Sequence, residues 1–229
     1  MELEVVLTCE HARPGIPPKV ESTLGFDNTL LNSHQGFDDM AFDFAKALES
    51  ETDGTLFHYP YSRLFIDANR DVASPQFYGP YAEQLQATDM AYLLDAYWNY
   101  RRSIFDHVEA SLNSGKRVVA ISVHSFVAIY KGQPRQTELG LLFRPSIQKE
   151  LQLAEHIRST LGRLDPRLAM HFNRPYQGHT DCFLNDLSDH YANNDNYTGL
   201  FLELSQKIQL KDWLVKAPRL AQSFLQYKI

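Results

Sequence analysis

The sequence contains only two cysteines, Cys9 and Cys182, among its 229 residues. Two cysteines are too few for a disulfide framework, so we expect a reduced, cytoplasmic protein. No hydrophobic run approaches the ~20 residues that a membrane-spanning helix needs. The acidic start, Met1–Glu4, lacks the basic and apolar parts of a signal peptide. These absences predict a cytoplasmic protein with no membrane partner.

The sequence also has fewer basic than acidic residues: 22 Lys and Arg against 28 Asp and Glu, which gives a net charge of −6. A nucleic-acid-binding protein usually shows a basic footprint, which this balance does not provide. The hydrophobic share of 44% and the charged share of 22% are ordinary for a globular protein. The composition therefore argues against a nucleic-acid partner and says nothing about the oligomeric state.

Apolar strands and amphipathic helices alternate along the chain. Strand-like patterns cover residues 3–8, 55–59, 64–66, 117–123, 168–172 and 199–204. Helical periodicity covers residues 37–48, 88–113, 147–162 and 211–227. The stretch RVVAISV at 117–123 is a continuous run rich in β-branched residues with no strict polar alternation, as strands are when helices cover both faces of a parallel sheet. Residues 1–229 therefore predict one α/β domain with a central mixed, largely parallel sheet and helices on both faces.

Polar residues that suit catalysis gather where the expected strands end. In open α/β sheets, ligands bind beyond the carboxyl ends of the strands. The residues at these ends are Glu10, His11, Asn69, Arg70, His124, Ser125 and Glu203. Asp38 joins them from the first turn of the helix expected at 37–48. We expect these side chains to share one site.

The same residue types are those that a zinc hydrolase needs. Catalytic zinc commonly binds two histidines and one carboxylate and leaves one position for water. A further carboxylate, which is not a ligand, then moves the proton. His11, His124 and either Asp38 or Glu10 are candidate ligands, and Glu203 is the candidate base because it lies inside an apolar strand. The chain has no close HExxH-type pair to fix the ligands.

Three arginines, Arg63, Arg70 and Arg135, are candidate clamps for anionic groups of a substrate or for an oxyanion. Structural interpretations compete with each assignment. A histidine that ends a buried strand is often a hydrogen-bonded core residue, and Asp38 is also a favourable residue for a first helical turn. The segment YSRLFIDANRD at 61–71 is equally compatible with a structural salt-bridge cluster.

Seven short motifs follow one another in a fairly specific order. They are TCEHARPGIP at 8–17, SHQGFDDMA at 33–41, YSRLFIDANR at 61–70, VHSF at 123–126, PRQTELGLLF at 134–143, NRPY at 173–176 and LFLEL at 200–204. With this set the sequence resembles the N-formylglutamate amidohydrolase (N-formylglutamate deformylase) family over most of its length. The resemblance implies one domain, residues 1–229, with a zinc-carboxypeptidase-like (phosphorylase/hydrolase-like) fold and a mixed sheet of the eight-stranded type.

The resemblance also implies roles for individual residues. One zinc ion is expected on His11 and His124, with other divalent metals left open, and Glu203 is expected to be the base. The pair Asn69–Arg70 resembles the Asn-Arg pair that holds the substrate carboxylate in carboxypeptidases, and Tyr176 is expected near the substrate.

The carboxylate ligand has two candidates. Neighbouring residues on a strand point to opposite faces, so Glu10 and His11 reach one ion together only if the chain turns after the strand. Asp38 begins the next helix, as the carboxylate ligand of the larger fold does, and we therefore expect Asp38 to be the ligand. Glu10 is then a rival ligand or a partner of a ligand.

The implied reaction is zinc-dependent hydrolysis of an N-acyl amino acid, first of all N-formyl-L-glutamate to L-glutamate and formate in histidine degradation. Alternatives are a carboxypeptidase- or aspartoacylase-like zinc hydrolase with another substrate, a non-catalytic binding protein, and a Cys9 nucleophile with His11 as its base. Two departures lie close to the site. Arg13 stands where the family commonly has glycine, and residues 204–206 lack the arginine that usually follows the late glutamate.

Overall fold

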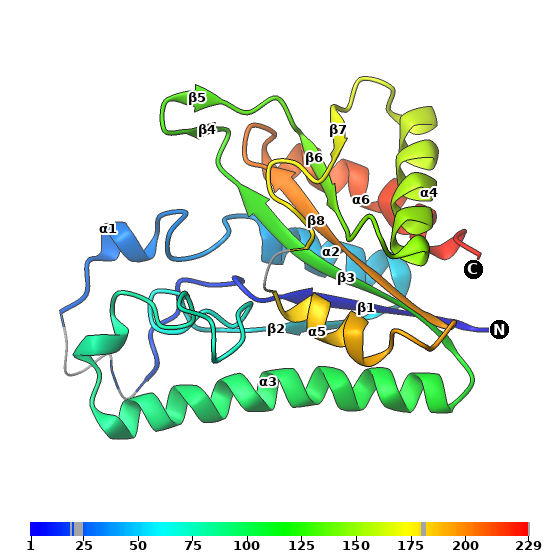
Figure 1. Ribbon diagram of the computed structural model, residues 1–229. Coiled ribbons are helices and arrows are strands. Elements are labelled where there is room, and N and C mark those ends of the chain that lie inside the picture. The colour runs from blue at the N-terminus through cyan, green and yellow to red at the C-terminus, as the bar shows by residue number, and fades with distance from the viewer. Residues whose placement is uncertain (19, 21–24, 180–181, 229) are drawn as a thin grey trace.

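A six-stranded sheet runs through the centre of the computed structural model, which describes residues 1–18, 20, 25–179 and 182–228 (Figure 1). Its strands are β1 (Leu3–Cys9), β2 (Thr55–His58), β3 (Arg117–Phe126), β6 (Leu139–Leu142), β7 (Met170–Phe172) and β8 (Tyr197–Ser205). They lie in the order β2-β1-β3-β8-β6-β7. The first four are parallel, while β6 is antiparallel to β8 and parallel to β7. The sheet is therefore mixed and largely parallel, as predicted.

Helices cover both faces of this sheet (Figure 1). One face packs against α2 (Ala41–Thr52), α4 (Gln148–Leu164) and α6 (Leu210–Leu225). The opposite face packs against α3 (Ala87–Asn113) and α5 (Phe183–His190). The remaining elements are the short helices α1 (Asn28–Leu31) and η1 (Ala82–Gln84) and the hairpin of β4 (Ile129–Tyr130) and β5 (Gln133–Pro134). None of the described helices is both long and apolar enough to cross a membrane.

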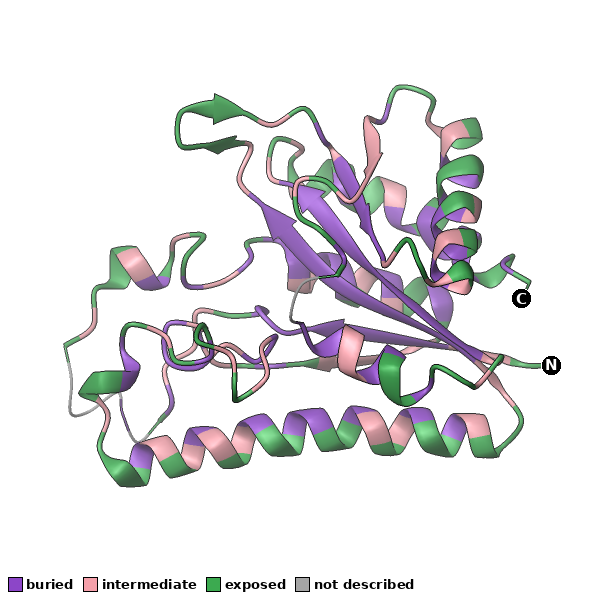
Figure 2. Cartoon of the chain, in the orientation of Figure 1, coloured by how far each residue is buried: buried purple, intermediate pink, exposed green. Residues whose placement is uncertain are grey.

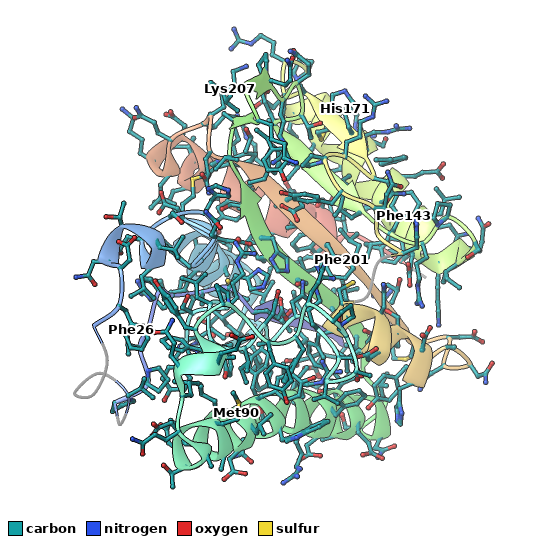
Figure 3. The ribbon with its side chains drawn as sticks, turned by 60° about the vertical axis from the view of Figure 1, so that its left-hand side comes forward. Phe26, Met90, Phe143, His171, Phe201 and Lys207 are labelled. Atoms are coloured by element: carbon teal, nitrogen blue, oxygen red, sulfur yellow. The ribbon has the colours of Figure 1, made fainter. Side chains whose placement is uncertain are left out.

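Strand β3 explains why its sequence is apolar without alternation. Val119, Ile121 and Val123 pack with the helices of the first face, whereas Val118 and Ala120 pack with α3 and α5. Both sets are fully buried, and the central strands are buried along their length in Figure 2. Phe201 of β8 lies near the middle of the molecule, among the side chains drawn in Figure 3.

Three local expectations are wrong. Residues 64–66 form no strand but a turn-rich segment with one isolated bridge, between Ile66 and Tyr78. Helix α2 begins at Ala41 and not at residue 37, because Met40 adopts a left-handed conformation with φ of 62°. Asp38 therefore precedes the helix. The sheet has six strands in the part of the chain that the structure describes, not the eight of the expected type.

The strand order places a topological switch point at the centre of the sheet. From β1 the chain passes through α2 to β2 on one side of β1, then through α3 to β3 on the other side. The connections leave the carboxyl ends of β1 and β3 in opposite directions, which opens a crevice between them. A ligand site is expected at this crevice.

Candidate active site

A cavity of about 290 Å³ lies where β1, β3 and β8 end. Its wall contains His11 just after β1, His124 near the end of β3 and Glu203 near the end of β8. Other wall residues come from three further parts of the chain: His34 and Asp38, then Arg63, Asn69 and Arg70, then Tyr176, Gln177 and Cys182. The residues that the sequence places at strand ends are therefore neighbours, and they meet at the switch point.

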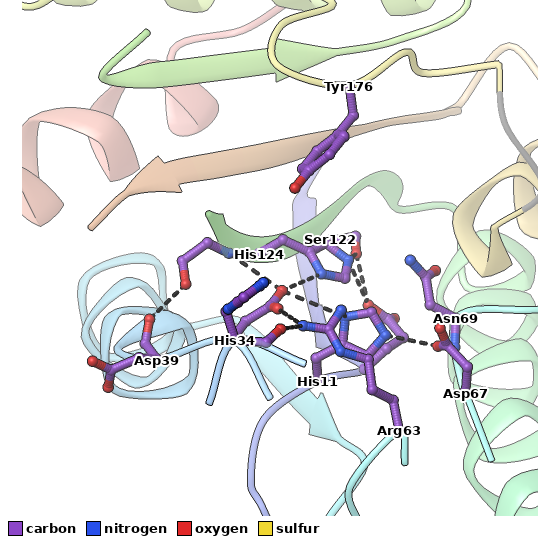
Figure 4. A network of polar contacts seen from close by, with 12 residues as sticks. His11, His34, Asp39, Arg63, Asp67, Asn69, Ser122, His124 and Tyr176 are labelled. Atoms are coloured by element: carbon purple, nitrogen blue, oxygen red, sulfur yellow. Dashed lines mark hydrogen bonds and ion pairs between the residues drawn. The ribbon is translucent and has the colours of Figure 1, made fainter. Parts of the chain in front are cut away.

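His11, Asp38 and His124 form one buried group in this wall, and Figure 4 shows the two histidines of the group close together. Oδ2 of Asp38 lies 2.9 Å from Nδ1 of His124 and 3.4 Å from Nδ1 of His11. All three side chains are buried, and one ligand atom from each lies within 4.8 Å of the other two. Two imidazoles thus point the same ring nitrogen at one carboxylate.

The backbone brings these three residues together. Strand β1 ends at Cys9, and the chain turns at Glu10 and His11, which frees their side chains from strand alternation. The amide of Asp38 donates to the carbonyl of His11 at 3.0 Å, so the segment before α2 is fixed directly to this turn. Asp38 is therefore placed by a backbone hydrogen bond rather than by a helical turn.

Glu10 lies on the far side of His124 from Asp38. Its Oε2 is 3.2 Å from Nε2 of His124 and accepts from Ser122 Oγ at 2.8 Å, while Oε1 accepts from Tyr100 at 3.0 Å. Burial raises the pKa of Glu10, but the hydrogen bond with His124 and the charge on it lower the pKa to about 2. Glu10 is thus a buried carboxylate that fixes the outer nitrogen of His124.

Asp67 has the same relation to His11. Its Oδ1 lies 2.7 Å from Nε2 of His11, and the charges of His11 and Arg63 hold its pKa below the ordinary value although burial raises it. Each histidine therefore has a carboxylate at Nε2 and presents Nδ1 to Asp38. Metal-binding histidines are commonly fixed in this way, because the second carboxylate sets the tautomer and the ring orientation.

The cluster favours positive charge at its centre. Burial lowers the pKa of His124, but Asp38 and Glu10 hold it well above the ordinary value. Burial likewise raises the pKa of Asp38, while Arg63 and His11 hold it well below the usual range. Two imidazoles and one carboxylate in a buried, cation-favouring place are the donor set that zinc takes in hydrolases, so the three residues fit a divalent metal ion.

Glu203 stands beside this centre without joining it. It is paired in register with His124 on β3, so the two side chains lie on the same face of neighbouring strands. Its Oε2 is buried and has no hydrogen-bond partner among the described residues. Burial raises the pKa of Glu203 to about 7. A carboxyl that titrates near neutrality, lines the cavity and has an unbonded oxygen has the properties of a general base.

A family model for N-formylglutamate amidohydrolase matches residues 3–209 of the chain. The chain belongs to this family. The protein is therefore a hydrolase of amide bonds, and the resemblance inferred from the seven motifs is confirmed. Among curated proteins, none matches the sequence.

Two solved structures share the fold of this family member. The gene product Atu2144 from Agrobacterium tumefaciens has 24% identity and a TM-score of 0.80, over 97% of this chain and 89% of that protein. The N-formylglutamate amidohydrolase from Ralstonia eutropha JMP134 has 16% identity and a TM-score of 0.68, over 96% of this chain and 94% of that protein. At these identities the likeness concerns the fold alone.

In this family member the predicted substrate residues divide into two groups. Asn69, Arg70 and Tyr176 line the cavity, whereas Arg135 is not among the described wall residues. Arg135 contacts Tyr176 instead: its Nη1 lies 3.3 Å from the Tyr176 hydroxyl, and its guanidinium lies 5.0 Å from the centre of the Tyr176 ring. Arg63 lines the cavity but directs its guanidinium at Asp38, at 2.6 Å.

Neither departure from the family pattern places a side chain in the cavity wall. Arg13 lies outside the wall, and Gln206 contacts a residue next to His124. Arg13 is exposed and stacks on the ring of Phe42 at 4.5 Å, outside the cavity wall. Gln206 donates to Ser125 Oγ at 3.0 Å, and Ser125 follows His124 directly.

Cys9 is fully buried, and burial raises the pKa of its thiol well above 9, so the cluster contains no thiolate nucleophile.

Sequence reasoning missed two members of the site, Asp67 and His34. Asp67 lies inside the motif YSRLFIDANR, two residues before Asn69, and His34 lies inside SHQGFDDMA. Because both are polar residues of the conspicuous motifs, the sequence could have indicated them as candidates. Their contacts, however, depend on turns that no periodicity describes, such as the bond from the Asp67 amide to the Phe77 carbonyl.

Proposed function

We propose that the protein is a zinc-dependent amidohydrolase of N-acyl amino acids, with N-formyl-L-glutamate as the first candidate substrate and L-glutamate and formate as products. Family membership supports the reaction class. The observation that carries the metal and the chemistry is the buried His11–Asp38–His124 cluster with Glu203 beside it. A cytoplasmic role in histidine degradation agrees with this reaction.

His11, Asp38 and His124 would hold the zinc ion, with Glu10 and Asp67 fixing the outer ring nitrogens of the two histidines. When bound there, zinc supplies a Lewis acid that lowers the pKa of water to about 7. Arg63 keeps Asp38 ionised and in place, because its Nη2 lies 2.6 Å from Oδ1 of Asp38.

Glu203 carries the proton in this proposal. It accepts a proton from the attacking water as the new C–O bond forms at the acyl carbon, and it then donates that proton to the amide nitrogen as the C–N bond breaks. In the metal-free site burial raises the pKa of Glu203 to about 7, so this carboxyl can both take and return a proton more readily than an ordinary glutamate. No other ionisable group of the described wall combines such a pKa with an unbonded buried oxygen.

Asn69 and Arg70 bind the anionic end of the substrate. They lie together on the wall, and an amide next to a guanidinium suits a carboxylate. Arg70 is also the candidate partner of the oxyanion that develops on the acyl oxygen. Tyr176 lies above the cluster in Figure 4, where it would cover the bound substrate.

The test is the variant Glu203→Gln, which keeps the shape of the side chain and removes its ability to take a proton. We expect the variant to keep one zinc ion per chain and to lose turnover of N-formyl-L-glutamate by about two to four orders of magnitude. Metal analysis and formate release measure the two effects. Glu155→Gln, at an exposed position of α4, is the matched control and should behave as the parent protein.

Other outcomes would change the assignment. Loss of zinc from Glu203→Gln would make Glu203 a ligand, and unchanged turnover would remove it from the mechanism.

A panel of N-acyl amino acids and C-terminal peptides tests the substrate class. Cleavage of peptides with all acyl amino acids untouched would contradict the proposal and favour a carboxypeptidase.

A further inference from the structure

The cavity wall offers fewer cations to a substrate than the sequence predicts. Arg63 donates through Nη2 to Asp38 Oδ1 and to the carbonyl of His34, both at 2.6 Å, and through Nε to the carbonyl of Gln35 at 3.2 Å. Its Nη1 lies 3.0 Å from Nδ1 of His11. Nearly all its donors are therefore engaged, and a bidentate grip on a substrate carboxylate is not open to it.

A substrate with two carboxylates needs a second cationic or donor group. Asn69 and Arg70 account for one carboxylate of N-formyl-L-glutamate, and Arg135 lies outside the described wall. His34 is the remaining described wall residue that can carry a positive charge. The others are Arg63, Arg70 and the two histidines that contact Asp38.

The turn that carries His34 is firmly built. Ser62 Oγ and the amide of Arg63 donate to the carbonyl of Gly36, at 2.8 and 3.3 Å. A Cβ atom at Gly36 would come within 2.0 Å of the Leu31 carbonyl oxygen, so the turn closes only with glycine there. With the bonds from Arg63 to residues 34 and 35, the exposed turn has a fixed backbone, and the imidazole it carries is presented at one place.

The ring of His34 is available at that place. His34 is exposed, and its ring nitrogens make no hydrogen bond within the described residues. In Figure 4 His34 lies on one side of the cluster and Asn69 on the other, with His11 between them. An acyl amino acid whose amide lies over the cluster therefore meets Asn69 and His34 at opposite ends.

We propose that His34 binds the side-chain carboxylate of the substrate, so that this residue selects dianionic acyl amino acids over neutral ones. The inference rests on the proposed function and names the specificity residue of that same site. An imidazole N–H donates a hydrogen bond to a carboxylate oxygen, and a protonated ring adds the attraction of opposite charges. Loss of such a charge-assisted bond lowers affinity roughly 10- to 100-fold.

The test compares N-formyl-L-glutamate with N-formyl-L-glutamine, a neutral compound of nearly the same shape, on the zinc-loaded protein. We expect the parent protein to prefer the glutamate compound in kcat/KM by roughly 10- to 100-fold. His34→Ala should reduce this ratio to about one through KM for the glutamate compound, with unchanged zinc content. Gln35→Ala, in the same turn but outside the described wall, is the matched control and should keep the preference.

A preference that survives in His34→Ala would overturn the inference, and its loss in Arg135→Ala would then assign the second carboxylate to Arg135. Equilibrium binding of the products L-glutamate and L-glutamine gives a second readout without turnover. If the protein hydrolyses neither formyl compound, N-formyl-L-glutamate fails as the substrate, while the binding ratio still tests His34. If L-glutamate binds the parent protein and His34→Ala equally, the inference about His34 fails alone.

Discussion

Each histidine of the cluster is fixed at both of its ring nitrogens. Asp38 faces Nδ1 of His11 and His124, Asp67 faces Nε2 of His11, and Glu10 faces Nε2 of His124. This arrangement gives each of the three carboxylates around the two histidines a role, although only Asp38 is expected to be a ligand. One carboxylate belongs to the candidate metal-binding group, and two others would determine which nitrogen each ring offers to a metal ion.

Residue types at the strand ends predicted which side chains would meet, but not which atoms. His11, Asp38 and His124 were expected together and lie together. The choice between Asp38 and Glu10 could not be made from spacing, because it depends on the turn at Glu10 and His11. Once β1 ends at Cys9, Glu10 faces Ser122 and Tyr100, and Asp38 reaches both histidines.

Glu203 gives the metal-free protein a characteristic dependence of stability on pH. Its pKa of about 7 in the folded chain lies above the ordinary value of 4.5, so the folded state keeps a proton that the unfolded state releases. The free energy of unfolding should therefore fall as pH rises from 4.5 to 7. Glu203→Gln should remove this loss, and above pH 7 it should be more stable than the parent by up to about 3 kcal/mol.

Urea-induced unfolding of metal-free protein, recorded at several pH values, measures this difference. The advantage of Glu203→Gln should shrink as pH falls from 7 and should vanish below pH 4.5, where the carboxyl is protonated in both the folded and the unfolded state. An advantage that is constant over the whole range would show that Glu203 has an ordinary pKa in the folded protein.

At the scale of elements, strand β6 makes room for Glu203. Gly140 of β6 is paired with Glu203 of β8, and a Cβ atom at residue 140 would lie 2.2 Å from the Arg174 carbonyl oxygen and 3.0 Å from Cβ of Glu203. Neither neighbour is the flexible end of a side chain. The sequence pattern did not predict β6, because a four-residue strand containing glycine has little periodicity.

Gly140→Ala should therefore damage both stability and activity. We expect the free energy of unfolding to fall by roughly 1–3 kcal/mol, because backbone must move to admit the methyl group. Turnover should fall as well, since the displaced atoms include Glu203. Gly162→Ala in α4 is the control, because its methyl group would meet only Met170 Cε at 3.8 Å.

In a helix, alanine is favoured over glycine by roughly 0.5–1 kcal/mol, so the control should be slightly stabilised. Thermal unfolding of the two variants gives the comparison. Equal effects of the two substitutions would mean that the crowding at residue 140 is absorbed without cost and that β6 does not position the base.

At the scale of the whole molecule, the site follows from the order of the strands. The alternation of strands and helices predicted a largely parallel sheet, and its switch point lies between β1 and β3, where His11 and His124 stand. Residues far apart in sequence, such as Glu10 and Tyr100, are brought together by that topology. The hairpin of β4 and β5 and the helix α5 were not predicted; the hairpin lies outside the six-stranded sheet, and α5 packs against one of its faces.

The central claim is that one zinc ion on His11, Asp38 and His124 is required for amide hydrolysis. The most direct measurement is formate release from N-formyl-L-glutamate by protein stripped of metal and then titrated with zinc. We predict no turnover without metal, full turnover at one zinc ion per chain, and no recovery in His124→Ala. Full turnover by the stripped protein, or equal recovery in His124→Ala, would contradict the account.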